Sequence, residues 1–354
     1  MRRRLFLKKS LYTSTAMVIG GRLSLLAETK PKSILVLGGT FFLGPAIVEA
    51  ALAGGHTVTL FNRGVTYPEL FPYVEKLRGF RSPNPDDENL SALGKRHWDV
   101  VIDVWPNDPF LAESAARLLA PRTRHYLYVS SIGAYDKIDK PGIDETHPIQ
   151  QWSSSTASYG PNKAESERRL HSIVGERLTI VRPGPIKGIR SYSSELMTWF
   201  RRMLNEQSII APGDGSDGVE IVDARDVAAF LLRAIDRSIY GVFNLTGPAM
   251  TFREFLEKSK AATDSDAELV WIPLDFLHAQ GITDHDFPFL IPGRNTFRIS
   301  SKKAYDAGWE TRPFRDTAFD ELESVALLER YRLQDTLPAD KQREVLRLWK
   351  NRAK

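Results

Sequence analysis

The sequence SILVLGGTFFLG, residues 33–44, joins an apolar run to a glycine-rich turn. The run Ser33–Leu37 predicts a buried β-strand, and the apolar spacing of Leu43–Ala53 predicts a helix directly after the turn. Glycines permit the tight turn, and the backbone N–H groups at a helix N-terminus can bind the pyrophosphate of a dinucleotide. We therefore favour a dinucleotide-binding turn over an ordinary strand-to-helix connection. Its predicted contact residues are Gly38, Gly39, Thr40, Phe41, Phe42, Leu43 and Gly44.

The chain after this turn repeats the alternation of short apolar runs and helical stretches. Further strands are predicted at Thr57–Phe61, Asp99–Asp103, His125–Ser130 and Leu178–Arg182, and further helices at Pro109–Leu119 and Ser158–Val174. Short apolar runs separated by helical stretches predict buried parallel strands joined by crossovers. The predicted fold class is therefore α/β, a Rossmann-type doubly wound parallel sheet.

The pattern of the sequence changes after Pro183, where predicted loops rich in Gly, Pro and Asp separate short elements. Residues 31–185 are predicted to form the NAD(P)-binding Rossmann domain. Residues 186–312 are predicted to form mainly a smaller C-terminal substrate-binding subdomain, together with elements that complete the Rossmann sheet. Residues 313–354 are predicted to form a helical segment whose charges cover a solvated face.

The N-terminal sequence RRLFLK, residues 3–8, precedes a weakly apolar stretch and resembles a twin-arginine (Tat) export signal over residues 1–27. A basic tail and an amphipathic surface helix are the alternatives. The apolar stretch is short and polar for a membrane span, so no stable membrane insertion is expected after signal removal. The predicted location is periplasmic or secreted, and cytoplasmic if the signal does not function.

The composition excludes several functions. The formal charge of +4 comes from the N-terminus, because residues 28–354 hold 42 basic and 44 acidic residues. A net charge of −2 there argues against a nucleic-acid partner. The chain contains no cysteine, which excludes thiolate chemistry, and the seven histidines show no metal-binding spacing. No Gly-x-Ser-x-Gly motif follows a strand, which disfavours hydrolysis.

The end of the second predicted strand suggests which dinucleotide is bound. Asn62 and Arg63 stand where a carboxylate that holds the ribose 2′-hydroxyl of NAD would be expected. An arginine can pair with a 2′-phosphate, so NADP is favoured and NAD is the alternative. Phe41 replaces the usual middle glycine of the turn, which should alter how closely the backbone approaches the phosphates. Asp103 and Pro183, at the ends of their strands, complete the predicted cofactor contacts.

Tyr159 and Lys163 stand four residues apart at the start of a predicted helix, so they share one face. A lysine cation one turn from a phenol stabilises the phenolate, which suits a general base. The sequence YVSSIGAY, residues 128–135, adds hydroxyl groups at the carboxyl edge of the sheet. Ser130 and Ser131 are both candidates for this role.

These motifs, with Arg182-Pro183-Gly184, resemble the extended short-chain dehydrogenase/reductases of the NAD-dependent epimerase/dehydratase family from about Ser33 to Trp309. The resemblance implies that Ser131 hydrogen-bonds the substrate oxygen and that Tyr159 is the general acid/base. It implies that Lys163 holds the nicotinamide ribose and assists Tyr159. Ser131 is preferred over Ser130 because it lies four residues before Tyr135, as in the family.

The same resemblance bears on the substrate. Family members that act on nucleotide-sugars carry an arginine for the diphosphate at the position of Val219. A sugar-like or polyol alcohol is therefore predicted instead, and a homodimer is compatible with the pattern. Other candidate substrate contacts, each also explained as packing or loop surface, are Trp105, Tyr192, Trp199, Asp223 and Arg294. An RNA-binding protein on the same fold and a catalytically inactive cofactor-binding protein remain the alternative functions.

Overall fold

The structure is a computed structural model that describes residues 30–104, 108–138, 140–191, 194–293, 299–328 and 337–352. The predicted signal at 1–27 lies outside these residues. Within the described ranges, no helix combines the length and apolar character needed to cross a bilayer.

A seven-stranded parallel sheet forms the centre of the fold, which confirms the predicted fold class. The strand order is β11-β6-β5-β4-β1-β2-β3, so successive strands run outward from β1 to β3 and then outward again from β4. The order reverses between β1 and β4, where Leu37 pairs with Asp103, and ligands bind at such a switch point. The strands are β1 (Ser33–Leu37), β2 (Thr57–Asn62), β3 (Glu75–Arg78), β4 (Trp98–Asp103), β5 (Thr123–Val129), β6 (Leu178–Pro183) and β11 (Gly241–Leu245).

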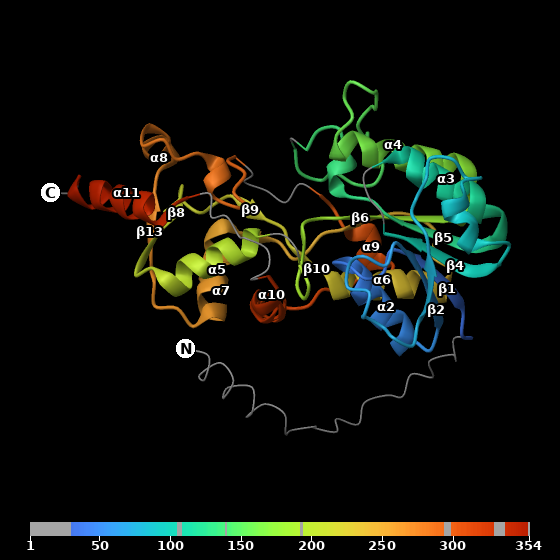
Figure 1. Cartoon of the computed structure of the whole chain (residues 1–354). Coiled ribbons are helices and arrows are strands. Elements are labelled where there is room, and N and C mark those ends of the chain that lie inside the picture. Colours follow the sequence, from blue (N-terminus) through green and yellow to red (C-terminus); the bar gives the residue numbers. More distant parts are fainter. Residues whose placement is uncertain are drawn as a thin grey trace. The chain divides into compact units, whose positions relative to one another are not determined.

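Helices cover both faces of this sheet (Figure 1). Side chains alternate between the two faces of a strand, and in β1 the buried Ile34 and Val36 pack with one helix layer while Leu35 packs with the other. The first layer contains α2 (Leu43–Ala53) and α6 (Ala224–Arg237), and the second contains α3 (Pro109–Leu119) and α4 (Tyr159–Val174). The sheet is therefore buried on both sides, as its apolar strands predict.

Elements after β6 build a second core around Trp199, which contacts Phe252, Phe255 and Phe287. Its helices are α5 (Glu195–Asn205), α7 (Phe252–Thr263), α8 (Leu274–Ala279), α10 (Phe314–Leu328) and α11 (Ala339–Asn351), and α9 (Lys302–Asp306) lies beside β11. The paired short strands are β7 (Ile186–Lys187) with β10 (Val222–Asp223), β8 (Ser208–Pro212) with β13 (Glu268–Ile272), and β9 (Gly218–Val219) with β12 (Met250–Thr251).

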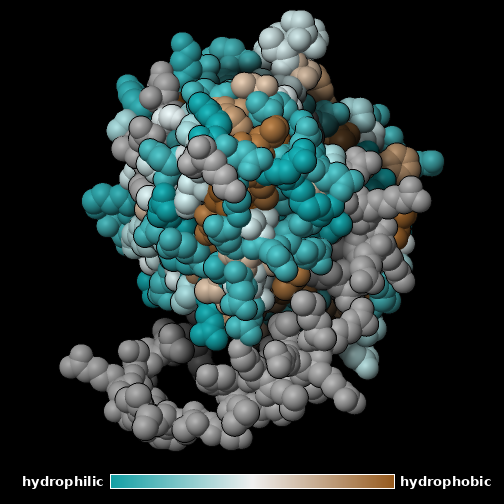
Figure 2. All heavy atoms as spheres, turned by 90° about the vertical axis from the view of Figure 1, so that its left-hand side faces the viewer, coloured by the Kyte–Doolittle hydropathy of each residue, from teal (hydrophilic) through white to brown (hydrophobic). Residues whose placement is uncertain are grey.

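The surface is largely hydrophilic on the face drawn in Figure 2, with apolar residues exposed in a patch near its middle.

Between residues 186 and 312, β11 joins the central sheet and α6 packs in the first core, while α5, α7, β8 and β13 build the second core. The chain thus returns to the first core after it has begun the second one. Residues that belong to the two cores are interleaved in the sequence.

Candidate active site

The glycine-rich turn follows β1 at the switch point of the sheet. A Cβ on Gly44 would lie 2.7 Å from the Cα of Gly39, so only glycine lets the start of α2 pack against the turn. Thr40 is buried, and Phe42 precedes α2 with a φ of 53°. This close approach of helix to turn is the geometry that a pyrophosphate-binding loop requires. The residues present therefore fit a dinucleotide.

Phe41 is 40% exposed at this turn. The absence of a glycine here does not disturb the contact between Gly39 and Gly44, so the bulky residue is accommodated on the open side of the turn. No side chain caps the N-terminus of α2. Phe41 thus places an apolar ring beside the loop predicted to hold the phosphates.

Asn62, at the end of β2, hydrogen-bonds the glycine-rich turn, the loop after β2 and the end of β3. Its Nδ2 donates to the carbonyl of Gly38 at 3.1 Å, and its Oδ1 accepts from Gly64 N at 3.0 Å and from Arg78 Nη1 at 2.6 Å. Arg78, the last residue of β3, was not predicted, because β3 itself has no apolar pattern. Two arginines, Arg63 and Arg78, therefore stand near the predicted ribose position.

Asp103, predicted as a cofactor contact, is fully buried and engaged within the protein. Arg81 donates to both of its carboxylate oxygens, and the Tyr126 hydroxyl donates to Oδ2 at 3.1 Å. Loss of Arg81 would leave this buried carboxylate without its cation at the end of β4, which is costly. The structure gives Asp103 this role as an ion-pair partner, which does not favour a direct contact with a ligand.

Ser131 and Tyr159 meet at Gly133. A Cβ on Gly133 would lie 3.4 Å from Ser131 Oγ and 3.4 Å from Tyr159 Cδ1, so the hydroxyl and the ring are neighbours. Ser131 Oγ accepts a hydrogen bond from Gly133 N at 3.0 Å and caps the short helix Ile132–Ala134. Tyr159 is 52% exposed. The two residues therefore offer an open site at the carboxyl edge of the sheet.

A second glycine brings α4 to this position. A Cβ on Gly160 would lie 2.4 Å from the carbonyl oxygen of Gly133 and from Gln150 Nε2. Gln150 Nε2 donates to the same carbonyl at 2.8 Å and joins the loop before α4 to the Ser131 turn. Any side chain at position 160 would push Tyr159 away from Ser131.

Ser130 points elsewhere. Its side chain is buried and its hydroxyl donates to Glu167, whereas Ser131 is half-buried beside Tyr159. A hydroxyl committed to a buried carboxylate cannot also reach a substrate at the open edge. The geometry thus supports the choice of Ser131.

Lys163 lies one turn beyond Tyr159 and is buried, with Nζ donating to the carbonyl of Val129 at 2.8 Å. Its Nζ also lies 4.9 Å from the centre of the Tyr128 ring. Burial lowers the pKa of Lys163 to about 8, and the carboxylates of Asp103 and Glu167 oppose this decrease. With this pKa the amine is mostly protonated at neutral pH.

The remaining predicted residues occupy varied environments. Pro183 is buried at the end of β6, and the following Gly184 lies beside Ile132. Trp199 is buried in the second core, and Asp223 caps α6 through Arg225 N, so both have structural roles. Val219 is buried in β9, which places no cation at that position. Trp105, Tyr192 and Arg294 lie outside the described residues.

Among the described residues, no three His, Asp or Glu side chains gather closely enough to hold a metal ion.

The chain is similar to known proteins in sequence and in fold. Residues 111–246 match the NAD dependent epimerase/dehydratase family. The chain is 26% identical over 304 residues to the chloroplast stem-loop binding protein of 41 kDa b of Arabidopsis thaliana. The aligned region covers 80% of this chain and 76% of that protein.

Two solved structures share the fold at low identity. The UDP-glucose 4-epimerase of Thermotoga maritima, solved with UDP-glucose, has a TM-score of 0.61 and 19% identity, over 84% of this chain and 99% of that one. The UDP-glucuronic acid 4-epimerase of Bacillus cereus, solved with NAD, has a TM-score of 0.63 and 16% identity, over 84% of this chain and 99% of that one. The match over residues 111–246 is therefore similarity to the family in that part of the chain, and the two solved structures show that the chain shares their fold.

Proposed function

We propose that the protein transfers hydride between a bound nicotinamide dinucleotide and a secondary alcohol of a sugar-like or polyol substrate. The observation that carries this proposal is the meeting of Ser131 and Tyr159 at Gly133, with Lys163 buried one turn behind Tyr159. The open edge admits the substrate, and the buried amine supplies a fixed positive charge below it.

The roles of the residues follow from their positions. Ser131 Oγ hydrogen-bonds the substrate oxygen, and the Tyr159 phenolate accepts the hydroxyl proton as the alcohol carbon loses hydride. The positive charge of Lys163 stabilises the phenolate. In the reverse direction Tyr159 returns the proton to the oxygen of the ketone. The nicotinamide, when bound, supplies the hydride acceptor and donor.

The glycine turn and Asn62 would hold the dinucleotide. Arg63 beside Asn62 supports NADP, whereas the Bacillus cereus epimerase, a protein of the same fold, was solved with NAD and supports NAD. We propose that Lys163 holds the nicotinamide ribose. We propose NADP as the preferred form.

For the substrate, we propose an alcohol without a nucleotide. This proposal rests on Val219, which is apolar and buried where the diphosphate-binding arginine of the family would stand. The two epimerases described above are named for UDP-sugars, so UDP-glucose and UDP-glucuronic acid belong in any substrate panel.

The experiment has two steps. Native mass spectrometry of the purified protein identifies a bound dinucleotide, and the loaded protein is then incubated with free sugars, polyols and UDP-sugars. With a free alcohol, we expect an increase in the absorbance of reduced nicotinamide at 340 nm, or an epimer detected by NMR. Absence of hydride transfer with every alcohol would contradict the proposed function, and activity with UDP-sugars alone would contradict the substrate class.

RNA binding is the second candidate, favoured by the similarity to the chloroplast stem-loop binding protein. Phosphate contacts would make affinity fall steeply with salt. A nitrocellulose filter assay with a stem-loop RNA over a salt series tests this function. The net charge of −2 after residue 27 favours the enzyme.

Export by the Tat route and a homodimeric state are further proposals. A variant with Arg3→Lys and Arg4→Lys should remain in the cytoplasm while the unchanged protein reaches the periplasm. Sedimentation of the purified protein tests the oligomeric state.

A further inference from the structure

A buried carboxylate lies directly behind the candidate catalytic residues. Glu167 is buried and follows Lys163 by one turn on the inner face of α4. Its Oε1 accepts hydrogen bonds from the Ser130 hydroxyl and from Arg182 Nε, the latter at 3.0 Å. Its Oε2 accepts from Arg182 Nη2 at 2.6 Å. One side chain thus joins a helix and the ends of two neighbouring strands.

Each of these three elements carries part of the proposed site. Ser130 is the direct neighbour of Ser131, so its position determines where the Ser131 turn begins. The helix that holds Glu167 also holds Tyr159 and Lys163. Arg182 lies in β6 immediately before Pro183, at the edge of the sheet. A shift of Glu167 would therefore move the hydroxyl, the phenol and the amine relative to one another.

We propose that Glu167 is a positioning residue that keeps Ser131, Tyr159 and Lys163 in one fixed arrangement by binding Ser130 and Arg182 at the same time. The inference rests on the proposed function, because it concerns the same three residues. Glu167 does not touch the open site, so it acts through its neighbours. Misplacement of reacting groups by about 1 Å can lower a rate about a hundredfold, which gives such a residue a measurable effect.

Glu167 also contributes to the charge around Lys163. The groups that face the amine are Asp103 from β4, Arg81 from the loop after β3, the Tyr128 ring from β5, the carbonyl of Val129, and Glu167 itself. The negative charge of Glu167 favours the protonated amine, and the burial of Lys163 opposes it. Loss of this charge should make Lys163 give up its proton at lower pH.

The test compares Glu167→Gln with Glu165→Gln, which makes the same change on the outer face of the same helix. Glu165 pairs with Arg168 and Arg169 at the surface and contacts none of the three residues of the site. NMR of protein labelled with [13Cε]lysine follows the titration of Lys163, whose signal is assigned with Lys163→Arg. This measurement needs neither substrate nor cofactor.

We expect Glu167→Gln to lower the titration midpoint of Lys163 by about one pH unit and Glu165→Gln to leave it unchanged. With any alcohol that the enzyme oxidises, we expect kcat to fall at least about tenfold in Glu167→Gln while KM changes little. A Glu167→Gln protein that is folded by circular dichroism and keeps both the midpoint and kcat would overturn the proposal.

Ser130→Ala provides a second test if Glu167→Gln does not fold. This variant keeps the pair between Glu167 and Arg182 but removes the link to the Ser131 turn. A decrease in kcat of about fivefold with an unchanged Lys163 midpoint supports the positioning role, and an unchanged kcat contradicts it. The two hypotheses fail separately: an unmodified enzyme without hydride transfer contradicts the proposed function, whereas an active enzyme unaffected by these variants contradicts only the role of Glu167.

Discussion

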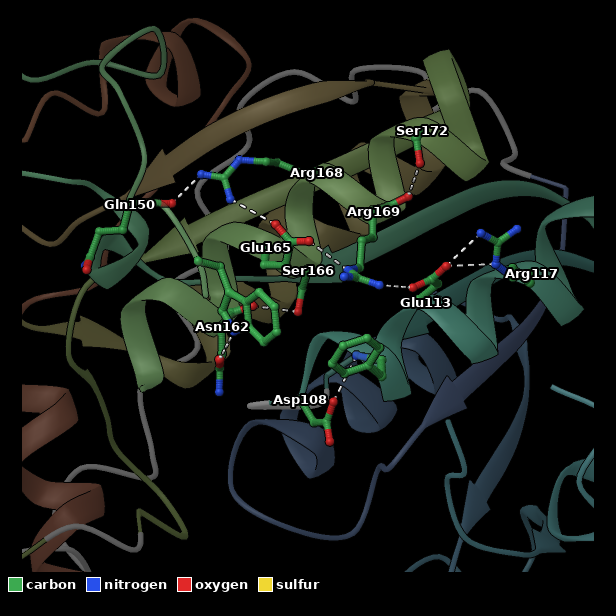
Figure 3. A network of polar contacts seen from close by, with 12 residues as sticks. Asp108, Glu113, Arg117, Gln150, Asn162, Glu165, Ser166, Arg168, Arg169 and Ser172 are labelled. Carbon is green, nitrogen blue, oxygen red and sulfur yellow. Dashed lines mark hydrogen bonds and ion pairs between the residues drawn. The ribbon is translucent and has the colours of Figure 1, made fainter. Parts of the chain in front are cut away.

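The inner and outer faces of α4 carry two networks of charges that differ in burial. On the outer face, Glu165 pairs with Arg168 and Arg169 (Figure 3). Arg169 also pairs with Glu113 of α3, which in turn pairs with Arg117. These side chains are 18% to 58% exposed. On the inner face, Glu167 and Arg182 are 4% and 5% exposed.

The number of ion pairs on a face of α4 does not indicate how much each pair stabilises the protein. Exposed pairs exchange hydration for weak attraction and contribute about 0–1 kcal/mol each. A buried pair need not stabilise the fold relative to apolar residues, but the loss of one partner leaves an unpaired buried charge, which costs about 3–5 kcal/mol. The outer face therefore tolerates change, and the inner face does not.

The largest effect is expected from Tyr159→Phe, which alters neither network. Removal of the phenol eliminates the proposed proton acceptor and donor, and we expect turnover to fall by a factor of at least about 100. The buried Lys163 remains in place, so dinucleotide affinity should stay within about twofold of the unmodified value. Steady-state kinetics and calorimetry check the two parts. Full turnover in this variant would exclude Tyr159 as the acid/base.

A direct test of the two faces compares Arg182→Met with Arg169→Met. Arg182→Met leaves Glu167 charged and buried, and we expect unfolding free energy to decrease by about 3–5 kcal/mol. Arg169→Met should decrease it by about 1 kcal/mol, which includes the lost contact of Arg169 with the Phe110 ring. Urea unfolding measures both. Equal losses would show that burial does not distinguish the faces.

The sequence predicted the apolar framework well because burial on both faces of a sheet leaves a strong pattern. The observed bounds of α2 and α3 are those predicted, and five of the sheet strands were found within two residues at each end. Strand β3 was missed because its sequence, Glu-Lys-Leu-Arg, is short and charged at the edge of the sheet. Completion of the sheet by β11 was predicted only in general terms.

The polar pairing behind the site could not be predicted in the same way. The sequence left Ser130 and Ser131 as candidates, and the difference between them depends on Glu167, which is 37 residues from Ser130. The role of Asp103 depends on Arg81, which is 22 residues away in a loop. Such pairs have no period and no fixed spacing, so a single sequence does not contain a signal for them.

The amine on the inner face should make stability depend on pH. The folded-state pKa of Lys163 is about 8, whereas a free lysine titrates near ~10.4. Between these values the unfolded chain binds more protons, so the contribution of Lys163 to stability rises with pH, by roughly 3 kcal/mol at most. We expect the unfolding free energy of Lys163→Met, relative to that of the unmodified protein, to be higher at pH 7 than at pH 10. A pH-independent difference in urea unfolding would contradict the depressed pKa.

The smallest expected effect concerns exposed charges near the glycine turn, which should matter for ligand binding more than for stability. We expect NADP to bind at least about tenfold more tightly than NAD, because a charge-assisted pair with the 2′-phosphate is worth about 1.5–3 kcal/mol. Arg63→Ala should remove this preference by weakening NADP alone. Arg78→Ala should weaken both dinucleotides, because Arg78 holds Asn62, which in turn holds the carbonyl of Gly38. Calorimetry with both cofactors measures the affinities of the unmodified protein and of the two variants, and the melting temperature checks that each variant folds. Equal affinities in the unmodified protein would contradict the predicted preference for NADP.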